Sequence, residues 1–234
     1  MKTVPLLAVI ALGAAAGVAQ AEVSATVTVA SDYDFRGVSQ TARDPALQAS
    51  LDWAAESGLY FGAWASNVDF GPGTDADIEL DTYAGFRGSF NDDLGFDLGV
   101  VQYNYFGDKD DVEFGEVYAG LTYKAVSAKY WYAWDYGNSG DAASYLELNG
   151  SLPLPNDFSL TLHGGYNFGD YWKASNSEYL DYSIGLSKNI GDFAVSLKWV
   201  DGSDFQSAQV TDGDVFTSEQ KIVLAVATTL PWGK

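Results

Sequence analysis

Residues 23–29 read Val23-Ser24-Ala25-Thr26-Val27-Thr28-Val29, and apolar and polar side chains alternate through them without a break. Successive side chains of a β-strand point to opposite faces, so this two-residue period gives the strand one apolar and one polar face. The alternation continues to residue 36, with Tyr33 and Phe35 on the apolar face and with a charged set on the polar face, namely Asp32, Asp34 and Arg36. This stretch predicts a first strand over residues 23–36.

The same period recurs along the chain and predicts about 12 strands, an even number that is typical of bacterial outer-membrane barrels. After the first strand, they are expected at residues 47–53, 59–66, 78–87, 94–99, 116–124, 126–135, 146–149, 158–163, 180–187, 193–199 and 222–230. The side chains expected to face lipid include Val27, Leu51, Leu80, Leu121, Leu162, Ile184, Val195 and Leu224. The predicted fold is all-β, a single closed antiparallel transmembrane β-barrel.

The connections between these strands alternate in length. Short ones are expected at residues 54–58, 89–93, 125, 153–157 and 189–192, and longer ones at 37–45, 67–77, 106–113, 136–143, 169–178 and 201–218. Outer-membrane barrels have short periplasmic turns and longer external loops, whereas a soluble sandwich has no reason to alternate in this way. Both termini are therefore expected at the periplasmic end.

Aromatic residues are abundant, with 7 Trp, 15 Tyr and 13 Phe. A barrel in lipid carries outward aromatic rings near both ends of its strands. The periplasmic set is predicted to be Trp53, Phe61, Phe86, Tyr123, Phe158 and Phe193, and the external set Tyr33, Phe35, Tyr105, Trp134, Tyr166, Tyr182 and Trp199. Aromatic residues filling a soluble sandwich core would explain their number but not their placement at strand ends.

The first 21 residues have the three parts of a secretory signal peptide: the basic Lys2, an apolar run over residues 4–18 and the small-residue cleavage site Ala19-Gln20-Ala21. A membrane-anchor helix is the alternative, but the apolar run is short for a span of about 20 residues. We predict a signal peptide at 1–21 and one barrel domain at 22–234.

Charge and residue types exclude several functions. Without Lys2, the chain has 11 basic and 32 acidic residues, so nucleic acid is not an expected partner. There is no Cys and only one His, His163, which excludes a zinc site, and no phosphate loop or dinucleotide fingerprint occurs. No serine lies in a G-x-S-x-G setting to pair with His163, so we expect neither an enzyme nor a cofactor.

Four stretches of the chain stand out: Ser31-Asp32-Tyr33-Asp34-Phe35-Arg36-Gly37-Val38-Ser39-Gln40, then Pro45-Ala46-Leu47-Gln48 leading to Asp52, then residues 62–70 (GAWASNVDF), and residues 79–85 (ELDTYAG). In order and spacing they resemble the TorF family of porin-like proteobacterial outer-membrane proteins. The resemblance implies an outer-membrane barrel with channel activity. The C-terminus differs from that of many such barrels, because the chain ends in Lys234 and the last aromatic residue is Trp232.

The polar strand faces would line the lumen of the barrel. The predicted constriction residues are Asp32, Asp34, Arg36, Asp52, Glu79, Asp81, Arg87, Glu116, Lys129, Glu147 and Asp181, and the same faces carry Asp97, Lys124 and Lys198. The acids outnumber the bases, which favours cations over anions, and opposite charges could pair into a plug or constriction. Alternatively, these groups only brace a filled interior.

These features together predict a porin-like outer-membrane channel for small, preferentially cationic or neutral solutes. Its expected partners are outer-membrane lipid, lipopolysaccharide and the small solutes or cations themselves. A non-conducting surface barrel is the alternative, with acidic loops that bind a partner or divalent cations. The loop acids are Asp69, Asp75, Asp77, Asp108, Asp110, Asp111, Glu113, Asp201, Asp204, Asp212 and Asp214. Their spacing lacks the pattern of an EF-hand, so solvated loop acids are the simpler interpretation.

Overall fold

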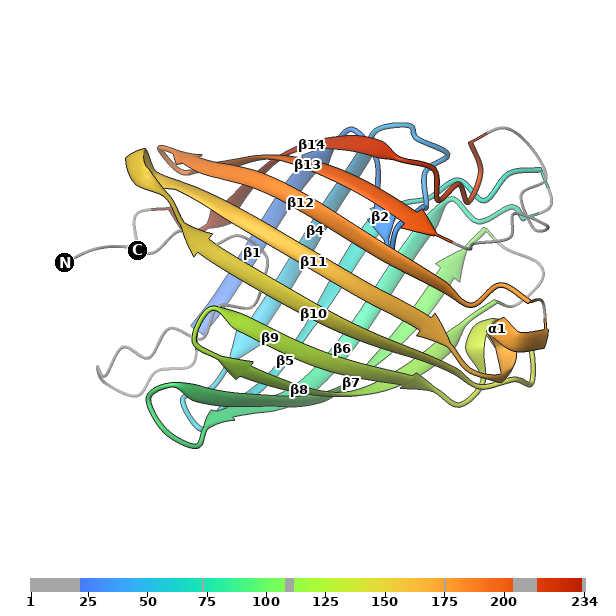
Figure 1. Ribbon diagram of the computed structural model, residues 1–234, viewed down its shortest axis with the longest axis horizontal. Coiled ribbons are helices and arrows are strands. Elements are labelled where there is room, and N and C mark those ends of the chain that lie inside the picture. Colours follow the sequence, from blue (N-terminus) through green and yellow to red (C-terminus); the bar gives the residue numbers. More distant parts are fainter. Residues whose placement is uncertain (1–21, 73, 108–111, 175, 204–213, 233–234) are drawn as a thin grey trace.

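A computed structural model describes residues 22–72, 74–107, 112–174, 176–203 and 214–232. Twelve of its strands form a closed antiparallel barrel (Figure 1). They are β1 (Glu22–Ala30), β4 (Ala46–Ala54), β5 (Leu59–Asn67), β6 (Ile78–Ser89), β7 (Leu94–Phe106), β8 (Phe114–Tyr123), β9 (Val126–Ala133), β10 (Ala143–Pro153), β11 (Phe158–Phe168), β12 (Tyr179–Ile190), β13 (Phe193–Ser203) and β14 (Lys221–Leu230). The predicted fold is confirmed. The predicted signal peptide lies outside the described residues.

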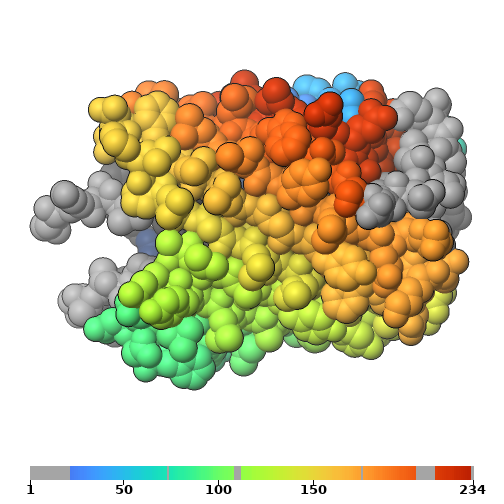
Figure 2. All heavy atoms as spheres, in the orientation of Figure 1, coloured from blue at the N-terminus to red at the C-terminus, as the bar shows by residue number. Residues whose placement is uncertain are grey.

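The ring closes at β1, which pairs with β4 on one side and β14 on the other. Ala25, for example, lies opposite Leu51 of β4 and opposite Leu230 of β14. Every other strand pairs with its neighbours in sequence, so no barrel strand has an unpaired edge. Figure 2 shows the wall seen from outside as one continuous surface.

The outer surface is apolar, as the two-residue period requires. Six of the eight side chains predicted to face lipid are exposed, including Leu51 and Ile184, and the other two, Leu80 and Val195, are half-buried on the same face. An exposed apolar band over a whole barrel is characteristic of contact with lipid. Within the described ranges, no helix is long and apolar enough to cross a membrane.

The two ends of the barrel differ as predicted. Figure 1 shows short turns at the end where β1 begins and β14 finishes, and long connections at the other end, among them the short helix α1 (Asp170–Ala174). Single 3₁₀ turns occur in one long and one short connection, at η1 (Tyr136–Asn138) and η2 (Pro155–Asp157). The barrel therefore has a simple end and an elaborate end, called here the short-turn end and the long-loop end.

Aromatic side chains lie on the outside of the barrel near both of its ends. Part of the aromatic set predicted for the external interface was wrong. Trp53 and Phe61 stack at 4.8 Å on the outer face near the short-turn end, and Trp134 is exposed near the other end. Tyr33, Phe35 and Tyr105 instead lie inside the barrel. Tyr105 is an even number of residues from Asp97 on β7, so it shares the inward face of that strand. Tyr33 and Phe35 come after β1 has ended, so they are not on a wall strand.

The first strand is shorter than predicted, because β1 ends at Ala30 and the chain then turns into the barrel. A small hairpin follows, made of β2 (Asp34–Phe35) and β3 (Val38–Ser39). It pairs with no wall strand, and its residues are half-buried or buried. The lumen of this barrel therefore contains a hairpin from its own first long connection.

Candidate functional site

The hairpin turns through Arg36 and Gly37, which both have left-handed backbone, with φ of 50° and 83°. Two such residues between Phe35 and Val38 give the mirror-image turn that matches the twist of a two-residue hairpin. Glycine is required at the second position, because an added Cβ would lie 2.5 Å from the Cβ of Asp181. Arginine is unfavourable at the first position, so its side-chain contacts must hold it there.

The hairpin tip is tied to opposite walls of the lumen. The Arg36 guanidinium donates two parallel hydrogen bonds to Glu116 on β8, from Nη1 to Oε1 at 2.9 Å and from Nη2 to Oε2 at 2.6 Å. From the other side, Lys221 on β14 donates to the Gly37 carbonyl at 3.1 Å. β8 and β14 lie six strands apart in a ring of twelve, so the hairpin bridges the full width of the barrel.

The base of the hairpin is held by two lysines. Lys198 on β13 contacts Asp34 at 2.9 Å, and Lys221 contacts the other carboxylate oxygen of Asp34 at 3.0 Å. Burial alone would raise the pKa of Asp34, but the two ammonium groups outweigh burial and lower the pKa below its usual value. Asp32 accepts a hydrogen bond from Ser39 at 2.6 Å, which holds the two arms of the hairpin together.

Apolar packing surrounds the hairpin in the long-loop half of the barrel. One cluster of buried residues comprises Ala30, Tyr33, Ala46, Val68, Phe70, Ala76, Val200 and Val223. A second comprises Val38, Val101, Tyr103, Phe114, Ala133, Ala143, Trp172 and Tyr179. Each cluster contains a residue of the first connection, Tyr33 or Val38, so the hairpin region is packed into the lumen like a core segment.

The Arg36 guanidinium also lies among aromatic rings. Its Cζ is 4.4 Å from the ring centroid of Tyr145, 5.6 Å from that of Trp131 and 4.7 Å from that of Phe35. Only 7% of the Arg36 side chain and 1% of the Glu116 side chain are exposed. A bidentate, aromatic-lined and buried ion pair of this kind depends strongly on geometry.

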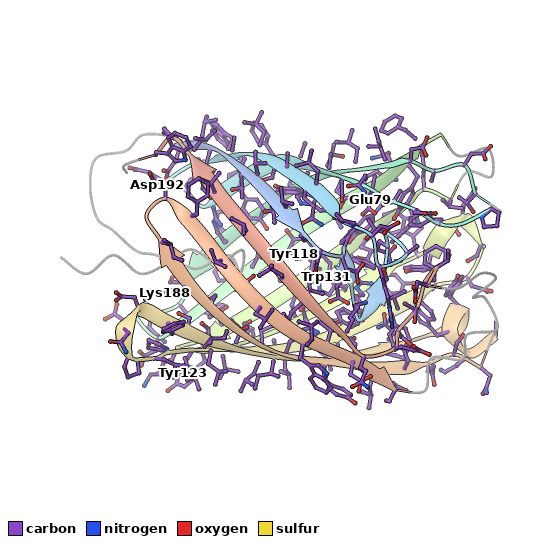
Figure 3. All side chains as sticks on the ribbon, turned by 90° about the horizontal axis from the view of Figure 1, so that it is seen from above. Glu79, Tyr118, Tyr123, Trp131, Lys188 and Asp192 are labelled. Atoms are coloured by element: carbon purple, nitrogen blue, oxygen red, sulfur yellow. The ribbon has the colours of Figure 1, made fainter. Side chains whose placement is uncertain are left out.

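A second polar group lies on the wall around the middle of the barrel. Lys129 donates to Asp97 at 2.9 Å, and the Tyr60 hydroxyl donates to the other oxygen of Asp97 at 2.5 Å. Tyr60 and Tyr118 hydroxyls contact one another, and Arg87 lies 4.9 Å from the Tyr60 ring centroid. Figure 3 shows Tyr118 and Trp131 inside the barrel, with Glu79 nearer the long-loop end.

On β10 to β12, the single histidine is part of the lumen wall. The two ring nitrogens of His163 each lie 2.7 Å from an oxygen, one from Asp181 and one from Asn149. The neighbouring Glu147 accepts a hydrogen bond from Trp131 Nε1 at 2.9 Å. Both His163 nitrogens therefore serve in a hydrogen-bond network between wall strands.

Two acids on β6 are less completely paired. The Tyr33 hydroxyl donates to Glu79 Oε1 at 3.0 Å, but Glu79 Oε2 and Asp81 Oδ1 are buried without a hydrogen-bond partner among the described residues. On the same strand face, the Tyr83 hydroxyl donates to Asp52 of β4. The β6 wall thus presents carboxylate oxygens that no basic side chain of the described residues neutralises directly.

The structure places every predicted constriction residue inside the barrel, although Asp32, Asp34 and Arg36 lie on the hairpin region and not on the wall. Lys124, which was predicted on the same polar faces but outside the constriction set, does not face the lumen: it lies in the turn after β8 and forms an exposed ion pair with Asp93 at 3.5 Å. Sequence reasoning missed Lys221. Lys221 and Val223 are two residues apart on β14 and share its inner face, whereas Ile222 between them points outward. This alternation could have placed Lys221 in the lumen.

A model of a family described as bacterial protein of unknown function (Gcw_chp) matches residues 14–230. The chain belongs to the Gcw_chp family. A search of curated proteins finds no match to this Gcw_chp chain. The resemblance to the TorF family stays a prediction.

Solved structures show the same fold. The Gcw_chp chain is similar to the KdgM porin, with a TM-score of 0.58 and 9% identity over 90% of this chain and 99% of that one. It is also similar to the NanC porin, with a TM-score of 0.56 and 8% identity over 88% and 98% of the two chains. A KdgM porin in complex with disordered oligogalacturonate gives a TM-score of 0.53 and 8% identity over 92% and 100%. The fold is thus that of porin barrels.

Proposed function

We propose that this Gcw_chp protein is an outer-membrane channel for small cationic or neutral solutes, narrowed near its external mouth by the β2–β3 hairpin. The observation that carries the proposal is the charge of the lumen. The described lumen holds nine carboxylates, at Asp32, Asp34, Asp52, Glu79, Asp81, Asp97, Glu116, Glu147 and Asp181. Five basic groups face them, at Arg36, Arg87, Lys129, Lys198 and Lys221.

This excess of acid concentrates cations and repels anions, because a narrow lumen with low-dielectric walls focuses the field of its charges. The KdgM structure with oligogalacturonate, a polyanion, shows that a barrel of similar fold accommodates an anionic saccharide. The acidic lumen here supports the opposite preference. Solute choice on this view resides in the wall residues and not in the shared fold.

A non-conducting barrel is the second candidate, and a specific observation favours it. The hairpin bridges β8 and β14, and two apolar clusters fill the same half of the lumen. A barrel of 12 strands lies between small filled barrels and wide porins, so strand number does not decide between the two candidates.

The outer-membrane location rests on the exposed apolar band together with the predicted signal peptide. The proposed partners remain outer-membrane lipid, lipopolysaccharide and the small solutes or cations. The long-loop end is then external, as the length of its connections suggests. Enzymatic use stays the weaker alternative, because both ring nitrogens of His163 are engaged, one with Asp181 and one with Asn149.

The deciding experiment is a planar-bilayer recording of purified, refolded protein. It compares the wild type with a variant in which residues 33–40 are replaced by a Gly-Ser linker of equal length. The proposal expects cation-selective current from the wild type and larger current from the linker variant. Current from the linker variant alone would favour the plugged barrel. If neither protein gives a current although both barrels are folded, the channel proposal is refuted.

A further inference from the structure

The wall of the lumen contains a cage for a flat cation. Its floor is the Glu116 carboxylate, and two of its sides are the rings of Trp131 and Tyr145. The present occupant is the Arg36 guanidinium, which gives one N–H to each carboxylate oxygen. A planar group with two parallel donors fits this arrangement, whereas a compact ammonium cannot make both bonds and stack on the rings.

The carboxylate and the two rings of the cage are hydrogen-bonded to wall residues. Tyr103 donates to Glu116 Oε2 at 3.0 Å, and the Tyr145 hydroxyl donates to Asp181 at 3.1 Å. Trp131 is fixed by its bond to Glu147. These partners belong to β7, β8, β9, β10 and β12, so the carboxylate and both rings have hydrogen bonds that do not depend on the hairpin.

The occupant, in contrast, does not belong to the wall. Arg36 reaches the cage from the hairpin, on a backbone with φ of 50° that is unfavourable for a residue other than glycine. The hairpin has other anchors, at Asp34 and Gly37, which hold it without Arg36. For a solute to enter the cage, the Arg36 side chain would have to leave it by rotating about its own bonds, while these other anchors hold the hairpin.

An empty cage is costly, because Glu116 would remain as a buried carboxylate without a counter-charge. A departing Arg36 must therefore be replaced by another cation. We propose that this cage, formed by Glu116, Trp131 and Tyr145, is a binding site for solutes that carry a guanidinium group, with Arg36 acting as an internal competitor. The inference deepens the proposed function, since it names the solute class that the acidic lumen would hold.

Calorimetry in detergent micelles tests the site without requiring conduction. Methylguanidinium chloride is titrated into wild type, Arg36→Ala and the double variant Arg36→Ala with Glu116→Gln, with methylammonium chloride at equal ionic strength as the control salt. We expect saturable methylguanidinium binding to Arg36→Ala, binding to wild type between about ten-fold and a hundred-fold weaker because Arg36 competes, and none to the double variant. Methylammonium should bind Arg36→Ala at least ten-fold more weakly than methylguanidinium.

The inference is overturned if the wild type shows no saturable binding at a hundred times the Kd of Arg36→Ala, because Arg36 is then a permanent part of the barrel. Equal binding to the double variant would also overturn it. If Arg36→Ala does not refold, Arg36→Gln, which keeps the aliphatic part of the side chain, takes its place. Current without binding would refute the cage alone, and binding without current would refute the channel alone.

Discussion

Gly37 at the tip of the hairpin lies directly against Asp181 on the wall, so closely that a Cβ added to Gly37 would be 2.5 Å from the Cβ of Asp181. The close approach seats the hairpin in the lumen. Gly140 provides a matched comparison, since its φ of 85° is nearly that of Gly37 but an added Cβ would meet nothing within 4 Å. The two glycines share the backbone requirement and differ in the contact.

Gly37→Ala should therefore destabilise the barrel more than Gly140→Ala does. Both changes carry the cost of a left-handed alanine, about 1 kcal/mol. Only Gly37→Ala also forces the hairpin away from Asp181, and we expect about 1–3 kcal/mol in addition. Urea unfolding of protein in lipid vesicles measures the difference, and equal losses would show that the hairpin is not seated against Asp181.

Lys221→Ala should weaken the fold strongly. The Lys221 side chain is 5% exposed and contacts Asp34 and Gly37, so its loss leaves buried acid less compensated, at a cost of about 3 kcal/mol. Lys124→Ala is the control, because Lys124 forms an exposed pair with Asp93 that is worth about 0–1 kcal/mol. Urea midpoints measure both changes. A similar small loss in both variants would argue against the lysine clamp.

The contribution of Asp34 should depend on pH in a defined direction. Its pKa in the folded protein is below the unfolded value of about 3.9, since Lys198 and Lys221 outweigh burial. The stability that Asp34 supplies is therefore fully present above the unfolded pKa and is lost as the pH falls through the folded pKa. The difference in free energy of unfolding between wild type and Asp34→Asn should be constant from pH 7 to about pH 5 and should shrink below about pH 4. A gap that widens in acid would contradict the assignment.

Ile184→Arg should hinder assembly more than Ser183→Arg. Ile184 is exposed on the apolar outer face of β12, and its neighbour Ser183 points into the lumen. An arginine at the bilayer midplane on the outer face costs about 2–4 kcal/mol, whereas the lumen accepts a charge more readily. The folded fraction after refolding into vesicles, measured by heat-modifiable gel mobility, tests this. Equal tolerance would refute the inside–outside assignment.

If the barrel conducts, Glu79→Gln with Asp81→Asn should lower the cation-to-anion permeability ratio. Carboxylates on the lumen wall act at short range in a low effective dielectric. Asp141→Asn with Asp170→Asn removes the same charge from exposed long-loop positions, where salt screens it beyond about 8 Å. The reversal potential in a salt gradient should shift for the β6 pair and hardly at all for the loop pair. An equal shift would place selectivity outside the wall.

The sequence predicted the wall well because each wall residue obeys a local rule. Alternation assigned Glu116 and Leu121 to opposite faces of β8 from their positions alone, and the register bears this out. It failed at Tyr33 and Phe35, which keep the same alternation but follow the point where the chain leaves the wall. Nothing local marks Ala30 as the last wall residue. The inward turn depends on partners such as Glu116 and Lys221, which are distant in sequence.

The long separations in sequence between the hairpin and its wall partners affect the order in which the barrel is completed. Arg36 and Glu116 are separated by 80 residues, Asp34 and Lys198 by 164, and Gly37 and Lys221 by 184. Contacts between such distant segments form slowly, since a long chain must first be closed into a loop. The hairpin is synthesised soon after β1, yet its last anchor arrives with β14, the strand that closes the ring. We therefore expect a nascent barrel with a hydrated interior, in which locking of the hairpin coincides with ring closure and marks the end of assembly.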